Sequence, residues 1–112
     1  MKKIILSVAF TIVMFGLQAQ DLKTTKTDTF KVSGNCGMCE KRIETAASEV
    51  NGVVKADWDA DKGIMILTYN PVETTIETVQ KAIAAVGYDT EKVKANDKNY
   101  SKLPRCCQYK RN

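Results

Sequence analysis

The sequence contains no histidine and no motif rich in carboxylates. Sites for Cu(II), Ca²⁺ and Mg²⁺ are therefore disfavoured, because imidazole nitrogen and carboxylate oxygen are the ligands that these ions prefer. A side-chain site for a soft metal would have to be built from sulfur. The chain has four cysteines, so their positions decide what such a site could be.

The chain also lacks a hydrophobic run long enough to cross a membrane. Its longest apolar run, residues 4–17, has 14 residues and follows Lys2 and Lys3. A helix that spans a bilayer needs about 20. The short run with its basic start predicts a cleavable signal peptide over residues 1–19, cut near Ala19 or Gln20, and export to the periplasm or the medium. No cysteine lies near the cut, so an acylated lipoprotein is not indicated.

A strong excess of basic residues is absent as well. The net charge is +4, and removing residues 1–19 takes away Lys2 and Lys3 and leaves +2. Nucleic-acid-binding proteins carry dense basic patches, so we expect no nucleic-acid partner. The length of 112 residues leaves room for one domain.

Hydrophobic periodicity predicts four strands and two helices. Phe30 and Val32 alternate with polar neighbours, as in a strand with one buried face. Ile43, Ala46 and Ala47 recur at helical spacing. The predicted elements are a strand over 27–33, a helix over 39–50, a hairpin over 54–69 that turns at 59–63, a helix over 76–87 with a capping box over 74–77, and a short strand over 88–93.

This βαββαβ order predicts an α+β fold, a ferredoxin-like sandwich with two helices on one face of a four-stranded antiparallel sheet. A short C-terminal tail with two cysteines follows it. Alternation along the hairpin predicts that Val54, Ala56, Trp58, Met65, Leu67 and Tyr69 face the helices.

Ile64 and Ile66 fall on the opposite face of the predicted sheet, which the helices leave open. We expect Tyr100 and Leu103 in the tail to cover that face.

Cys36 and Cys39 lie at the junction of the first predicted strand and the first predicted helix. Free N–H groups and the positive end of the helix dipole favour a thiolate there. A Cys-x-x-Cys pair alone is shared by metal sites, disulfide oxidoreductases and structural bridges. A thioredoxin-like redox motif needs a preceding βαβ unit, for which the mature chain has no room. This disfavours the thioredoxin-like interpretation, and a metal site for a thiophilic ion and a structural disulfide both stay open at this point.

The stretches "FKVSGNCGMCEKRIETA", "VNGVVKADWD", "ILTYNP" and "AIAAVGYDT" resemble the heavy-metal-associated domains of copper chaperones, copper-pumping P-type ATPases and periplasmic mercury-binding proteins. The resemblance covers about residues 28–93. It implies that Cys36 and Cys39 bind a metal ion and that Tyr88 lies beside the metal loop. The family usually has a methionine before its first cysteine, which this chain lacks, and Met38 is a candidate replacement.

The function implied by the resemblance is binding of Cu(I), with Hg(II) as an alternative, for transfer or sequestration and without enzymatic activity. The family transfers its ion by stepwise thiol exchange, so the expected partner is a metal-transporting membrane protein or another metal-binding protein.

The tail, residues 94–112, follows a lead-in over 20–27 and the domain over 28–93, and it contains Cys106 and Cys107. These two cysteines are candidates for additional metal ligands, for a disulfide with each other or with the first pair, or for no function. Four cysteines could also form a closed Zn²⁺ site. An exported thiol-disulfide protein and a domain with two structural bridges therefore stay open as alternatives.

Overall fold

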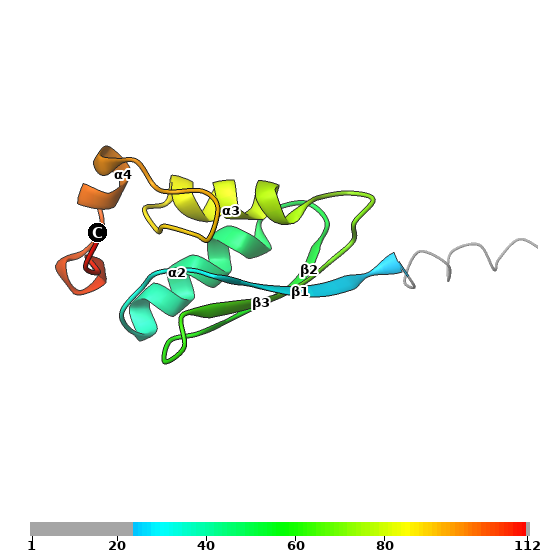
Figure 1. The fold of residues 1–112 in the computed structure, drawn as a ribbon, viewed down its shortest axis with the longest axis horizontal. Helices are drawn as coiled ribbons and strands as arrows, with labels where there is room; N and C mark the ends of the chain where they lie inside the picture. Colours follow the sequence, from blue (N-terminus) through cyan, green and yellow to red (C-terminus); the bar gives the residue numbers. More distant parts are fainter. Residues whose placement is uncertain (1–23, 112) are drawn as a thin grey trace, which may run out of the picture.

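Three antiparallel strands and two main helices form two layers in the computed structural model, which describes residues 24–111 (Figure 1). The elements are β1 (Lys26–Lys31), α2 (Gly37–Ser48), β2 (Val53–Asp59), β3 (Ile64–Tyr69), α3 (Ile76–Ala85), α4 (Asp97–Ser101) and the 3₁₀ turn η2 (Arg105–Cys107). The predicted signal peptide, residues 1–19, lies outside the described residues. Among residues 24–111, no helix is long and apolar enough to cross a membrane.

The sheet has the order β1-β3-β2, and α2 and α3 lie together on one of its faces (Figure 1). Met65 on the central strand pairs with Phe30 on one side and Trp58 on the other, and all three side chains are buried. Leu67 and Tyr69 are buried with them, whereas Ile66 is 43% exposed. The inward alternation predicted for β3 is confirmed.

The predicted fourth strand over 88–93 is wrong for the described chain, which contains a three-stranded sheet. This segment makes one isolated bridge, between Thr90 and Val32. The backbone N–H of Thr90 then bonds to the carbonyl of Val93, at 2.8 Å, and closes a turn. The N–H of Val93 donates to Thr90 Oγ1 in the same turn, so the segment bends away before it can form a ladder.

The inward position predicted for Val54 is also wrong, because its side chain is 64% exposed. The register between β2 and β3 shifts between Val53 and Lys55. Such an irregularity moves one residue out of the two-residue alternation. Ala56 and Trp58 beyond it keep the predicted phase.

The helix α2 buries the predicted stripe of Ile43, Ala46 and Ala47, and both helices differ slightly from the predicted bounds at their ends. The helix α2 begins at Gly37, two residues before the predicted start, and Gly52 (φ 100°) follows its end. The N-cap of α3 is Thr75, whose hydroxyl accepts from the N–H of Thr78 at 3.1 Å. The cap therefore lies one residue beyond the predicted position.

The tail packs at the end of the domain where α2 begins and α3 ends (Figure 1). Leu103 contacts Gly87 so closely that a Cβ at this glycine would lie 2.9 Å from Leu103 Cγ. Because Tyr100 and Leu103 pack here, the open sheet face keeps Ile66 exposed. The prediction that the tail covers that face is wrong, since its aromatic and apolar residues find partners beside Tyr88 instead.

Candidate metal site

Cys36 and Cys39 occupy the first turn of α2, where Cys36 is the N-cap residue. Their sulfur atoms lie 3.8 Å apart. Cys36 is half-buried and Cys39 is fully buried at 0% exposure. The loop lies close to the core because residue 34 is a glycine, at which a Cβ would come within 2.8 Å of the Trp58 ring. The pair thus has one sulfur open to solvent and one inside.

The two thiols differ in acidity. The backbone N–H groups of Cys39 and then Met38 lower the pKa of Cys36. Burial, followed by the thiol of Cys107, raises the pKa of Cys39. Cys36 is therefore the cysteine of this pair that becomes a thiolate at lower pH, which agrees with the effect expected at a helix N-terminus.

The turn η2 brings both tail cysteines to this loop. The Asn35 side-chain amide donates to the carbonyl of Cys106 at 3.1 Å. The sulfurs of Cys36, Cys106 and Cys107 all lie within 4.8 Å of one another. Successive residues of a 3₁₀ turn point about 120° apart, and accordingly Cys106 is exposed while Cys107 is buried. All four cysteines are free thiols.

Tyr88 lies beside the buried sulfurs of Cys39 and Cys107. It is fully buried, and burial followed by the thiols of Cys107 and Cys39 raises its pKa. Its hydroxyl has no hydrogen-bond partner of normal geometry among the described residues. The phenol therefore stays neutral and holds a free donor next to the two sulfurs.

Met38 does not pack beneath the loop. Its side chain is 52% exposed, and its sulfur lies 3.8 Å from the thiol of Cys106. The core position under the loop is occupied by Ile43 and Trp58, which contact the space around Gly34. Met38 therefore does not replace the missing family methionine as a core residue. Its sulfur instead lies with those of the four cysteines, and we call these five residues, Cys36, Met38, Cys39, Cys106 and Cys107, the sulfur cluster.

The sulfur cluster and the fold that carries it agree with a family description. Residues 29–89 match the Heavy-metal-associated domain. The chain belongs to this family. The family match identifies a heavy-metal-associated domain, and the geometry shows that this domain has a cysteine-rich site.

Two kinds of curated relative are similar to this chain. The chain is 33% identical over 89 residues to a mercuric transport protein periplasmic component of Pseudomonas aeruginosa, covering 79% of this chain and 93% of that protein. It is 34% identical over 62 residues to the copper chaperone CopZ of Staphylococcus epidermidis, covering 54% and 91% of the two chains. The crystal structure of oxidised MerP from Ralstonia metallidurans CH34 superposes with a TM-score of 0.57 at 31% identity, over 60% of this chain and 94% of that one.

The tail lies beyond the residues that match the heavy-metal-associated domain, and it is fastened by contacts that the sequence did not reveal. The Tyr109 hydroxyl donates to the carbonyl of Gly87 at 2.9 Å and accepts from the N–H of Asp89 at 2.8 Å. Arg111 forms a two-pronged ion pair with Asp89, at 3.1 and 2.9 Å, and a third bond to Asp97. We call Tyr109, Arg111 and Asp89 the tail clasp.

Aromatic rings reinforce the clasp. The Tyr109 ring stacks on Tyr88, with centroids 6.0 Å apart, and meets Tyr100 edge-on at 5.0 Å. The Arg111 guanidinium lies 4.7 Å from the centre of the Tyr100 ring. Two tyrosines and two arginines near the Cys-Cys pair, Tyr100, Tyr109, Arg105 and Arg111, were the available sequence signal, but they do not show which residues of the domain they contact.

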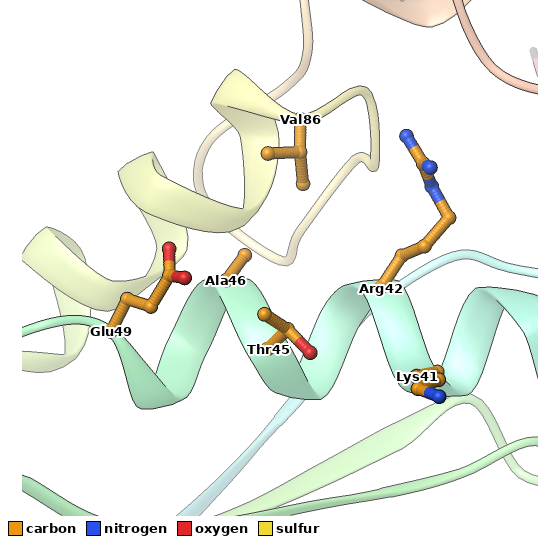
Figure 2. Close-up of a pocket in the computed structure, with 6 residues that line it drawn as sticks. All are labelled: Lys41, Arg42, Thr45, Ala46, Glu49 and Val86. Carbon is orange, nitrogen blue, oxygen red and sulfur yellow. The ribbon is translucent and has the colours of Figure 1, made fainter.

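Two other surface features contain no sulfur. A groove of about 370 Å³ lies between α2 and the end of α3. Figure 2 shows the residues that line it, which are Lys41, Arg42, Thr45, Ala46, Glu49 and Val86. The second feature is a cluster of three carboxylate side chains, those of Glu40, Glu44 and Asp57. Glu44 is already used in the fold, because it accepts from the backbone N–H of Trp58 at 2.8 Å.

Proposed function

We propose that this chain is an exported protein that binds Cu(I) through Cys36 and Cys39 and retains it with the thiols of its tail. The observation that carries the proposal is the meeting of sulfurs from two distant segments at one end of the domain. Cys36 lies 3.8 Å from Cys39 and within 4.8 Å of Cys106 and Cys107. This arrangement holds only thiols, the donors that soft ions prefer.

The sulfur separations suit a shared ion. Metal–thiolate bonds of about 2.3 Å put two sulfurs about 4.6 Å apart in a linear site and about 4.0 Å apart in a trigonal one. The trio of Cys36, Cys106 and Cys107 falls within 4.8 Å and so needs only small side-chain movements to meet around one ion. Low coordination by thiolates is typical of Cu(I) and also suits Hg(II).

The residues around the site would contribute in different ways. Cys36, with its lowered pKa, would bind first as a thiolate. Each further thiol would lose its proton to solvent as its sulfur binds. The free hydroxyl of Tyr88 would donate to a thiolate of Cys39 or Cys107, a hydrogen bond that is stronger than one to a neutral thiol.

Release would follow by thiol exchange, in which a partner's sulfur forms a bond to the ion as one of these sulfurs leaves. Cys39 and Cys107 are buried, so a partner's thiols would approach from the side of Cys36 and Cys106. The tail therefore favours retention over rapid transfer. A metal-transporting membrane protein or another metal-binding protein is the partner that this chemistry fits.

Hg(II) is the second candidate ion, and it is supported by the mercuric transport relative, which aligns over 93% of its own length. Zn²⁺ has less support. A closed tetrahedral site requires four sulfurs about 3.8 Å from one another. Only the sulfurs of Cys36, Cys106 and Cys107 form a group in which every separation is within 4.8 Å, and Cys39 is not part of it.

The proposed organisation is a signal peptide over 1–19, a lead-in over 20–27, the metal-binding domain over 28–93 and the tail over 94–112, with export to the periplasm or the medium. Support comes from the apolar run at 4–17 and from the periplasmic relative. N-terminal sequencing of the protein recovered from the cell envelope tests it, because retention of residues 1–19 would contradict export by cleavage.

An anaerobic titration with a coloured Cu(I) chelator tests the function. The fully reduced protein should withdraw Cu(I) from the chelator, and Cys36→Ser/Cys39→Ser should abolish this ability. Cys106→Ser/Cys107→Ser should weaken retention, and Val72→Thr, at an 83% exposed position in the turn between β3 and α3, serves as the control. A wild-type protein that cannot compete for Cu(I) would refute the copper proposal, and the same titration with Hg(II) would then follow.

A further inference from the structure

Four of the five sulfurs in the cluster form a row that runs from the protein surface into the core. Met38 Sδ lies 3.8 Å from Cys106 Sγ, Cys106 Sγ lies within 4.8 Å of Cys36 Sγ, and Cys36 Sγ lies 3.8 Å from Cys39 Sγ. Met38 and Cys106 at the outer end are exposed, Cys36 is half-buried and Cys39 at the inner end is fully buried. Each step is short enough for two neighbouring sulfurs to hold one ion, since a linear site needs about 4.6 Å.

The outer end of the row is held in place by the fold. Met38 lies in the first turn of α2, so its backbone is fixed by the helix. The Cys106 backbone is held by the bond from Asn35, and the turn η2 points its side chain outward. A thioether and a thiol are thereby placed together on the surface, whereas apolar side chains of this size are usually buried.

We propose that Met38 and Cys106 form a second, outer site for Cu(I), which takes up the ion and passes it to Cys36 and Cys39. This inference rests on the proposed function and extends it with an entry route. A thioether–thiolate pair selects soft ions such as Cu(I). It binds more weakly than two thiolates, because the thioether carries no charge, so the ion moves inward.

The transfer is an exchange of ligands with no change of oxidation state. Cys106 loses its thiol proton to solvent when the ion arrives. A bond from Cys36 to Cu(I) then forms, with loss of the Cys36 proton to solvent, as the bond from Met38 breaks. Cys36 and Cys106 hold the ion together in the intermediate between the two sites. A bond from Cys39 forms, with loss of its proton, as the bond from Cys106 breaks and the Cys106 sulfur takes up a proton. Cys107 is the tail thiol that then retains the ion.

Protein expressed from the full sequence with ¹³C-labelled methionine methyl groups provides the test, with Cu(I) added anaerobically in steps. We expect the Met38 methyl signal, assigned by its loss in Met38→Leu, to shift when more than one equivalent is present. Met65, buried in the core, is the internal control and should not shift. Cys106→Ser should abolish the Met38 shift and leave the first equivalent bound.

The rate of uptake gives a second readout. Met38→Leu should slow the withdrawal of Cu(I) from its chelator complex and leave the final occupancy of the first equivalent unchanged. If Cu(I) binds tightly and the Met38 methyl signal stays in place at every ratio, the outer site is wrong and the proposed function stands. If no Cu(I) binds, the proposed function fails and the outer site fails with it.

Discussion

Replacing Tyr109 with Phe removes one hydroxyl from the contact between the tail and the domain, and leaves the stacked ring in place. That hydroxyl donates to the carbonyl of Gly87 and accepts from the N–H of Asp89, and both bonds are buried. A buried hydrogen bond contributes about 1 kcal/mol, and each group left without a partner costs about 1–3 kcal/mol. We therefore expect Tyr109→Phe to lower the free energy of unfolding by about 3 kcal/mol.

The assay is urea unfolding followed by circular dichroism, with hydrogen exchange at the Asp89 amide as a local probe. A loss of this size would lower the melting temperature by about 10–20 °C for a domain of this length. Tyr69→Phe is the matched control, because its hydroxyl donates one bond, to Asp28 at 2.8 Å, at a partly buried position in the sheet. This control should cost about 1 kcal/mol and leave exchange at Asp89 unchanged.

A decrease in the free energy of unfolding of less than about 0.5 kcal/mol is typical of a neutral surface change. If Tyr109→Phe has an effect this small and the Asp89 amide stays protected from exchange, the tail clasp does not hold the tail. The argument that the tail places Cys106 and Cys107 beside the loop would then be refuted. If stability is unchanged and exchange at Asp89 is faster, the tail docks but unfolds separately from the domain.

Three further predictions concern the loop and the tail. Because the pKa of Cys36 is lowered and that of Cys39 is raised, iodoacetamide should alkylate Cys36 at lower pH than Cys39. Peptide mapping that finds Cys39 modified before Cys36 would contradict this. Gly87→Ala adds a Cβ 2.9 Å from Leu103 at φ 108°, and it should destabilise the protein by about 2–3 kcal/mol in thermal unfolding; a neutral effect would show that the tail does not pack there. Arg111→Met removes the ion pair of the tail clasp and should speed the release of Cu(I) to a chelator in stopped-flow measurements; an unchanged rate would separate the tail clasp from metal retention.

The sequence pattern predicted the parts of the fold that depend on local spacing. The helical stripe of Ile43, Ala46 and Ala47 and the alternation of Met65, Leu67 and Tyr69 are read correctly, because both depend on neighbours along one element. The predicted strand over 88–93 failed because a local turn at Thr90 competes with sheet pairing.

The metal loop could be located from Cys36, Cys39 and the stretches that resemble the family, but the complete sulfur cluster could not. Its assembly depends on the ion pair between Arg111 and Asp89 and on the two hydrogen bonds of Tyr109. These contacts join residues 20 to 22 positions apart, and no periodicity encodes them. Similarly, the exposure of Met38 follows from its position in the first turn of α2, one residue before a buried cysteine.

X-ray absorption at the copper edge, on protein loaded anaerobically with one equivalent of Cu(I), tests the central claim most directly. The proposed site predicts sulfur neighbours only, with fewer of them in Cys106→Ser/Cys107→Ser than in the wild type. Nitrogen or oxygen neighbours would contradict a site built from Cys36, Cys39 and the tail thiols, and an identical sulfur count in both proteins would exclude the tail from the site.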